Sequence, residues 1–237
     1  VRLILALIAF IPFIRIRNTN KQEKVHLILL GALQYGVMYT CYLSAFRFLP
    51  SHLVALFSVL TPLYIVIIND LRQRYFTPWY LLSALLSVSG AAIIKMGNIG
   101  SNEIWLGFGL MQIANMAFAF GQVYYRDWKR NRPHITDGSV FGFLYLGAAI
   151  FTSIATLLIS HQSPIPINAT PTQWLVLIYM GFVASGLGFF FWNKGGTQTS
   201  VGVLATFNNA VVPLAMFASL FIFGEANGGT SEELIRL

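Results

Sequence analysis

Eight apolar stretches fill nearly all of this 237-residue chain. A helix needs about 20 predominantly apolar residues to cross the hydrocarbon core of a bilayer. Inside lipid every backbone N–H and C=O must bond within the segment, so such stretches can only be helices. The sequence therefore predicts an all-α polytopic membrane protein. Its spans are expected at residues 1–14, 25–46, 51–69, 78–97, 104–125, 139–160, 173–193 and 200–223.

The composition agrees with a protein surrounded by a lipid bilayer. Hydrophobic residues make up 56% of the chain and charged residues 10%, whereas a soluble domain has about 25% charged residues. The net charge of +7 does not indicate a nucleic-acid partner, because the cations lie in short loops and do not share one face. With Cys41 as its single cysteine the chain cannot form an intrachain disulfide. We expect no cofactor and no metal.

The lysine and arginine residues predict the orientation. Of the 15, 11 lie in the predicted loops at residues 15–24, 70–77, 126–138 and 194–199. Such residues concentrate on the cytoplasmic side, so these four loops are predicted to be cytoplasmic and the protein is expected in the plasma (bacterial inner) membrane. The longest polar segment has about 14 residues, too few for a folded core. No ATPase domain fits, so any transport must be driven by gradients.

Two regions of the chain resemble each other. They share, in the same order, two glycines five residues apart, a lone cation, a short turn and a mid-span proline. These residues are Gly31, Gly36, Arg47 and Pro62 in the first copy, and Gly181, Gly186, Lys194 and Pro213 in the second. The second copy starts five spans after the first, so the copies cross the membrane in opposite directions. This is an inverted-topology repeat, as found in many secondary transporters.

The sequences LSAFRFLPSHLVALFSVLTPL and NKGGTQTSVGVLATFNNAVVPLAMFASLFIFGE resemble the drug/metabolite transporter superfamily, in its EamA-like branch. The closing Gly224-Glu225 pair also matches that family, whereas the first copy has Asn69-Asp70 instead. The resemblance implies ten helices in two inverted halves. Residues 1–100 would be helices two to five and residues 101–237 helices six to nine, with the first and last helices missing. A helix start expected at Thr230 supports this last expectation.

Polar residues inside the spans are the candidate binding residues, because they are costly in lipid and usually face the bundle interior. Gln112 and Asn115 share a polar helix face, and Asn208 lies near Pro213. The predicted substrate-binding residues are Tyr39, Gln112, Asn115, Asn208, Gln34 and Tyr35, with the first four lining one central cavity. The alternative is that the amides only bond neighbouring helices and that the tyrosines lie at the membrane interface.

Prolines and glycines of the two copies are predicted to provide kinks and gating surfaces. A proline removes a backbone N–H and frees a carbonyl, so it bends a helix. Glycine lets helices approach closely. The residues expected in these roles are Pro62, Pro213, Gly36 and Gly186.

The expected function is gradient-driven transport of small organic metabolites by alternating access. No Asp or Glu lies in the middle of a span, so the predicted site is neutral, aromatic and rich in amides. That favours amino acids or related carboxylates and amines, with drugs or sugar-like solutes as the alternative. A channel or receptor is a weaker alternative, since neither a charged ring nor a carbonyl filter is evident. An intramembrane enzyme is also a weaker alternative, because the sequence has neither an H-E-x-x-H nor a G-x-S-x-G catalytic motif. The oligomeric state is not indicated.

The orientation can be tested by cysteine labelling. We expect a cysteine placed at Asn131 in a Cys41→Ala background to be protected from a membrane-impermeant maleimide in intact cells, because the predicted 126–138 loop is cytoplasmic. The same cysteine should react after the cells are permeabilised. Labelling of intact cells would show that the orientation is inverted.

Overall fold

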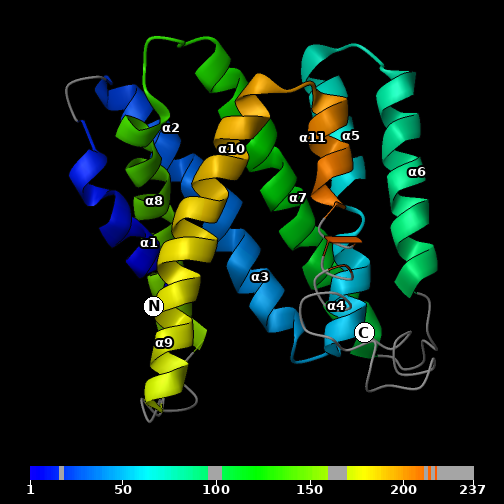
Figure 1. Cartoon of the computed structure of the whole chain (residues 1–237), viewed down its shortest axis with the longest axis horizontal. Coiled ribbons are helices and arrows are strands. Elements are labelled where there is room, and N and C mark those ends of the chain that lie inside the picture. The colour runs from blue at the N-terminus through cyan, green and yellow to red at the C-terminus, as the bar shows by residue number, and fades with distance from the viewer. Residues whose placement is uncertain (16–18, 96–102, 160–169, 211–212, 215–216, 218–237) are drawn as a thin grey trace. The chain divides into compact units, whose positions relative to one another are not determined.

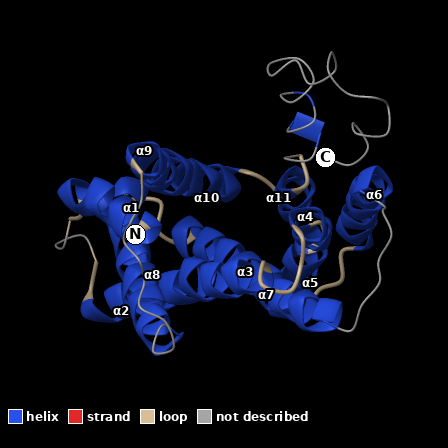
Figure 2. Cartoon of the chain, turned by 90° about the horizontal axis from the view of Figure 1, so that it is seen from below, coloured by secondary structure: helices blue, strands red, loops and turns tan. Residues whose placement is uncertain are grey.

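The computed structural model describes residues 1–15, 19–95, 103–159, 170–210, 213–214 and 217 (Figure 1). Within these ranges the chain forms helices and no strand (Figure 2), which confirms the all-α prediction. The Gly224-Glu225 pair and the helix start expected at Thr230 lie outside the described residues.

The helices follow the predicted spans closely. Their order is α1 (Arg2–Phe10), η1 (Ile11–Phe13), α2 (Lys21–Gly31), η3 (Ala32–Val37), α3 (Met38–Ala45), α4 (Ser51–Ser58), α5 (Thr61–Gln73), α6 (Pro78–Lys95), α7 (Glu103–Arg130), α8 (Asp137–Ile159), α9 (Pro171–Tyr179), η5 (Met180–Leu187), α10 (Gly188–Gln198) and α11 (Val201–Asn208). The η1 segment is a 3-10 turn, and η3 and η5 are π-helical. Three spans are therefore built from more than one kind of helical segment.

Among the residues that the structure describes, five helices are long and apolar enough to cross a membrane: Lys21–Ala45, Leu53–Gln73, Ile104–Arg130, Asp137–Leu158 and Pro171–Gln198. The helix over Arg2–Phe13 is apolar but shorter. Many large apolar side chains lie on the surface, and some polar side chains are buried among the mainly apolar core. Leu157 is 69% exposed, for example, whereas the polar side chain of Gln34 is fully buried. An apolar surface is what lipid requires.

One loop that is predicted to be cytoplasmic is more helical than the sequence predicts. The predicted loop at 126–138 begins inside α7, which continues to Arg130. Basic residues in a last helical turn interact favourably with the helix dipole, and Lys129 and Arg130 occupy that turn. The extension is also tied to the next helix, because Tyr125 donates a hydrogen bond to Asp137 over 2.7 Å. Lys129 lies 3.9 Å from the same carboxylate.

The chain groups into two compact units. Unit 1 contains Val1–Thr40 and Gly121–Gln198, and unit 2 contains Cys41–Phe120 and Thr199–Leu237. Each unit takes segments from both predicted sequence halves, 1–100 and 101–237. Because spatial grouping does not test a sequence repeat, the assignment of these halves stays a prediction.

In unit 1, α8 packs against α1, α2 and η3, and α1 also packs against η5 (Figure 1). Glycines bring the α2 and α8 backbones into direct contact. A Cβ atom added at Gly31 would lie 2.0 Å from the Leu144 carbonyl oxygen. One added at Gly147 would lie 1.8 Å from the Ile28 carbonyl oxygen. Only glycine therefore fits at these two positions, and small residues at such contacts are how membrane helices gain packing energy.

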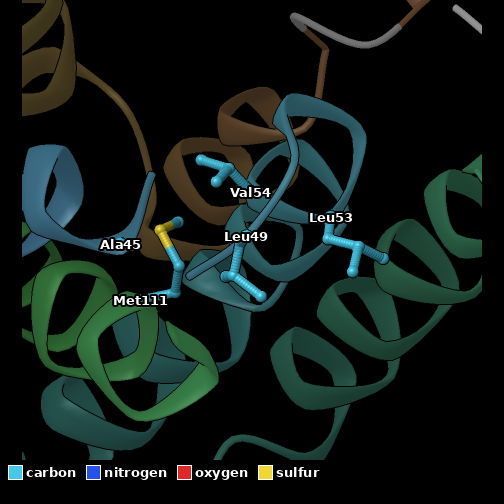
Figure 3. Close-up of a cluster of buried hydrophobic side chains, with 5 residues drawn as sticks. All are labelled: Ala45, Leu49, Leu53, Val54 and Met111. Carbon is cyan, nitrogen blue, oxygen red and sulfur yellow. The ribbon is translucent and has the colours of Figure 1, made fainter. Parts of the chain in front are cut away.

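In unit 2, α5, α6 and α11 pack against one another, and Figure 1 shows them running side by side. The tight turn between α3 and α4 anchors a small hydrophobic core (Figure 3). That core consists of the buried side chains Ala45, Leu49, Leu53, Val54 and Met111. Met111 brings α7 onto the turn, so the turn is held by packing as well as by its own hydrogen bonds.

The α2–α8 contact generates a stability prediction. We expect Gly147→Ala to lower the thermal unfolding midpoint in detergent, because overpacking against rigid backbone costs about 1–3 kcal/mol. Gly138→Ala is the matched control, since it lies in the same helix with nothing within 4 Å of the added Cβ. Its midpoint should be unchanged or slightly higher. Equal midpoints for the two variants would show that α2 and α8 are not in backbone contact.

Candidate functional site

Polar side chains gather at one place in each unit, and both places lie where a helix departs from regular α geometry. In unit 1 the irregular segments are η3 and η5. They occupy matching positions in the two repeat copies, since Gly36 lies in η3 and Gly186 in η5, each five residues after the first glycine of its copy. Isolated π-helical turns are rare and occur frequently at functional sites.

The irregular backbone of η5 is held by a tyrosine from α8. The buried Tyr145 hydroxyl lies 2.6 Å from the Ser185 carbonyl and 2.7 Å from the Gly186 carbonyl, so it donates to this pair. A π-helical turn shifts the backbone pairing and leaves carbonyls that need a donor inside the membrane. Tyr145 supplies that donor and fixes η5 against α8.

Asn193 on α10 joins two of the predicted binding residues. Its side-chain Nδ2 donates to the Tyr35 hydroxyl over 2.6 Å, and its Oδ1 accepts from Gln34 Nε2 over 3.1 Å. The Tyr35 ring stacks on Tyr145, with centroids 5.7 Å apart, and on Phe189, at 4.9 Å. Within the described part of the chain the buried Gln34 Oε1 has no hydrogen-bond partner. This cluster is thus rigid but retains one spare acceptor.

Tyr39, also in unit 1, lies next to η5. Its hydroxyl is 3.4 Å from Ser185 Oγ. Arg2 of α1 donates from Nε to the same Ser185 Oγ, and its guanidinium carbon is 4.9 Å from the centre of the Tyr39 ring. Two elements that are distant from η5 in sequence, α1 and α3, therefore converge on the Ser185 side chain.

In unit 2 the polar groups surround the break between α4 and α5. Pro62 has no N–H to donate to the Ser58 carbonyl, four residues earlier. Three successive carbonyls at the break accept side-chain hydrogen bonds. Phe57 accepts from Asn115 Nδ2 over 2.7 Å, Ser58 from Thr61 Oγ1 over 2.7 Å, and Val59 from Asn209 Nδ2 over 3.0 Å. The break is closed by donors from α5, from α7 and from Asn209, the residue that follows α11.

Gln112 lies beside this break, and within the described residues its side-chain Nε2 is an unused hydrogen-bond donor. Its Oε1 accepts from the Tyr64 hydroxyl over 3.1 Å and from Asn115 Nδ2 over 3.4 Å. Its buried Nε2 has no partner among the residues that the structure describes. Asn208 on α11 donates from Nδ2 to the Leu204 carbonyl of its own helix over 2.8 Å. Of these amides, Gln112 is the one with a donor left for a solute.

The structure thus brings some predicted residues together. Gln112 contacts Asn115, and Gln34 and Tyr35 meet at Asn193. Tyr39 belongs to unit 1, whereas Gln112, Asn115 and Asn208 belong to unit 2. The single cavity predicted for these four residues therefore stays a prediction. So do the gating roles of Pro62 at the break, Pro213 after α11, Gly36 and Gly186.

Arg2 and Ser185 were not among the binding residues predicted from the sequence. One signal was present for Arg2, since a helix from Arg2 to Phe13 is too short to span the bilayer and so does not carry Arg2 to the opposite surface. Ser185 has no comparable signal, because serine is common in membrane helices and its importance comes from the packing of α1 against η5.

The unit 2 cluster generates a prediction that separates helix contact from solute binding. Asn115→Ala should lower the thermal midpoint, because it removes the 2.7 Å bond to the Phe57 carbonyl and leaves only the longer 3.4 Å bond from the Leu60 N–H, at a cost of about 0.5–1.5 kcal/mol. Gln112→Ala should change stability less and weaken solute affinity roughly threefold to tenfold, the effect of one hydrogen bond worth about 0.5–1.5 kcal/mol. Thermal unfolding and transport kinetics on the two variants check this. Wild-type transport by the double variant, at normal membrane levels, would show that both amides only hold helices together.

Comparison with known proteins identifies the family. The profile of the EamA-like transporter family matches residues 1–96 and 105–229. The chain is 38% identical to the biotin transporter of Salmonella typhimurium over 94% of its own length and 74% of that protein. It is also 38% identical, with the same coverage, to the biotin transporter of Escherichia coli K12. A relative from Pseudomonas aeruginosa is 39% identical over 94% of this chain and 78% of its own.

A solved crystal structure shows the same fold. It superposes with a TM-score of 0.72 over 99% of this chain and 81% of its own, at 18% identity. At that identity the likeness concerns the fold alone. The family match covers most of the sequence, and the relatives are bacterial membrane transporters. The chain is therefore an integral inner-membrane protein that belongs to the EamA-like transporter family and transports small metabolites.

Proposed function

We propose that this protein is a gradient-driven transporter of biotin or of a closely similar carboxylic acid. The observation that carries the proposal is 38–39% identity over 94% of the chain to relatives, two of which are named biotin transporters. The polar clusters support it through their chemistry. Biotin combines a cyclic urea, an apolar ring and chain, and a terminal carboxylate that is charged at neutral pH.

Each cluster, taken by itself, has one group that suits a part of a urea, which has two N–H donors and one carbonyl acceptor. In unit 1 the buried acceptor Gln34 Oε1 suits a urea N–H. In unit 2 the buried donor Gln112 Nε2 suits a urea carbonyl. Neither group has a partner within the described ranges. A buried polar group without a partner is unfavourable, so each would be stabilised by a solute that brings the missing group. The aromatic side chains around Tyr35 would contact the apolar part of such a solute.

The amino-acid substrates expected from the sequence receive no support from these relatives. A carboxylate is common to amino acids and biotin, but the α-ammonium group of an amino acid requires an acceptor or anion beside it. The spans contain no mid-span Asp or Glu to supply a negative charge. Biotin needs no such anion, which favours it over an amino acid for this chain.

Alternating access needs helices that change shape without exposing backbone to lipid. The α4–α5 break at Pro62 and the π-helical segments with Gly36 and Gly186 provide such places, because side chains already satisfy several of their carbonyls. We propose that these segments, with Pro213, bend during transport. The predicted inverted halves at 1–100 and 101–237 would exchange their roles between the two states.

Uptake of labelled biotin tests the proposed function. We expect expression of the protein to restore growth on nanomolar biotin in a strain lacking both biotin synthesis and its own transporter. Proteoliposomes containing the purified protein should exchange internal for external biotin without altering it chemically. Leucine and lysine uptake should match empty liposomes. Amino-acid exchange without biotin exchange would contradict the proposal.

A further inference from the structure

Arg2 is placed within the membrane and not at its surface. Ser185 lies at the middle of the 28-residue helix Pro171–Gln198, with 14 residues before it and 13 after it. Because that helix is about 42 Å long, its centre lies well inside the hydrocarbon core, which is about 30 Å thick. The Arg2 Nε atom donates to Ser185 Oγ, so the guanidinium lies at the same depth.

The length of the first helix leads to the same depth by an independent route. Residues Arg2 to Phe13 form a helix of 12 residues, which rises about 18 Å. Its far end is followed by Arg15 and then by the capped start of α2 at Asn20, on the predicted cytoplasmic side. Arg2 therefore lies about 18 Å from the predicted cytoplasmic end of this segment, which is inside a hydrocarbon core about 30 Å thick.

The charge of Arg2 is not neutralised within the described part of the chain. Its contacts there are the Ser185 hydroxyl and the face of the Tyr39 ring, and neither carries a negative charge. An arginine has five N–H donors in a planar fork, and only Nε is engaged. The two terminal nitrogens, Nη1 and Nη2, form the edge that binds carboxylates in bidentate fashion. The residue is half-buried, so this edge is not sealed by protein.

The simpler explanation is that Arg2 has a structural role only and packs against Tyr39. A cation over an aromatic ring is stabilising, but it leaves the Nη donors unsatisfied in a region where a charge is among the most costly groups to place. Intramembrane arginines usually pair with carbonyls or carboxylates, or mark a substrate pathway. Because the described residues provide no such carbonyl or carboxylate, a place on the substrate pathway is favoured for Arg2.

The fold holds the three groups rigidly. A Cβ added at Gly181 would lie 2.6 Å from Leu5 Cβ and 3.2 Å from the Arg2 carbonyl oxygen. The glycine thus lets α1 approach η5 closely enough for Arg2 to reach Ser185. The Ser185 carbonyl is fixed in turn by Tyr145. Such preorganisation is what a charged ligand requires of its binding group.

We propose that Arg2, Tyr39 and Ser185 form an anion subsite that binds the carboxylate of the transported solute. The carboxylate bonds Arg2 Nη1 and Nη2, while Ser185 orients the guanidinium through Nε and the Tyr39 ring supports it from one face. This rests on the proposed function only in requiring that the solute be a carboxylic acid. The subsite would select acids over their neutral amides.

Binding of matched acid and amide pairs tests the subsite. The probes are biotin with biotinamide, and hexanoate with hexanamide, titrated against purified protein in nanodiscs. Wild-type protein should bind biotin at least tenfold more tightly than biotinamide. Arg2→Gln should weaken biotin roughly tenfold to a hundredfold, the range for charge-assisted hydrogen bonds, and leave biotinamide unchanged. Arg15→Gln is the control, because it removes an exposed charge and keeps the backbone bond from Arg15 to Ser139.

The outcomes separate the two proposals. If wild type prefers hexanoate to hexanamide through Arg2 but does not bind biotin, the biotin proposal fails and the subsite stands. If wild type binds biotin and biotinamide equally, the subsite is overturned and biotin transport stands. An acid preference that survives Arg2→Gln also overturns the subsite. Should Arg2→Gln fail to insert, Arg2→Lys retains the charge without the planar fork, and a several-fold loss confined to the acids is then expected.

Discussion

The structure depends on one constraint: in lipid no backbone carbonyl can be left without a donor. The helices of this protein are nevertheless irregular at η3, at η5 and between α4 and α5. At η5 the Tyr145 hydroxyl supplies a donor. At the α4–α5 break Asn115, Thr61 and Asn209 supply them. The polar side chains inside the spans are therefore partly explained by the backbone they stabilise, and only the groups left over are available to a solute.

The fold was predictable because its signal is simple. Apolar runs of sufficient length specify membrane helices by the solvent they enter, and the recurring glycines and prolines predict an inverted repeat. The helix ends were less predictable. Lys129 and Arg130 look like loop residues in a sequence, but the dipole of α7 and the Asp137 carboxylate keep them helical. The π-helical turns were not predictable, because no residue type specifies them.

The candidate site was predictable in type but not in its partners. Periodicity correctly placed Gln112 and Asn115 on one face of α7, where they contact each other. It could not show that Asn115 serves the Phe57 carbonyl whereas Gln112 keeps a spare donor, since that depends on where Pro62 breaks another helix. Arg2 is absent from the predicted binding residues because its place in the sequence suggests a cation at the membrane surface. Contact with Ser185, 183 residues away, determines its depth instead.

The closed break between α4 and α5 has a consequence for how the protein is made. Its donors Asn115 and Asn209 lie 58 and 150 residues beyond the carbonyls they satisfy. When the ribosome has delivered the broken helix, neither donor has yet been synthesised. Until they arrive, the Phe57 carbonyl has only its 3.4 Å bond from the nearby Leu60 N–H, and water or the insertion machinery must supply the donor that Asn209 later gives to Val59. This segment is therefore expected to settle fully into lipid only late in biogenesis. Residues 1–100 expressed alone would lack both donors permanently.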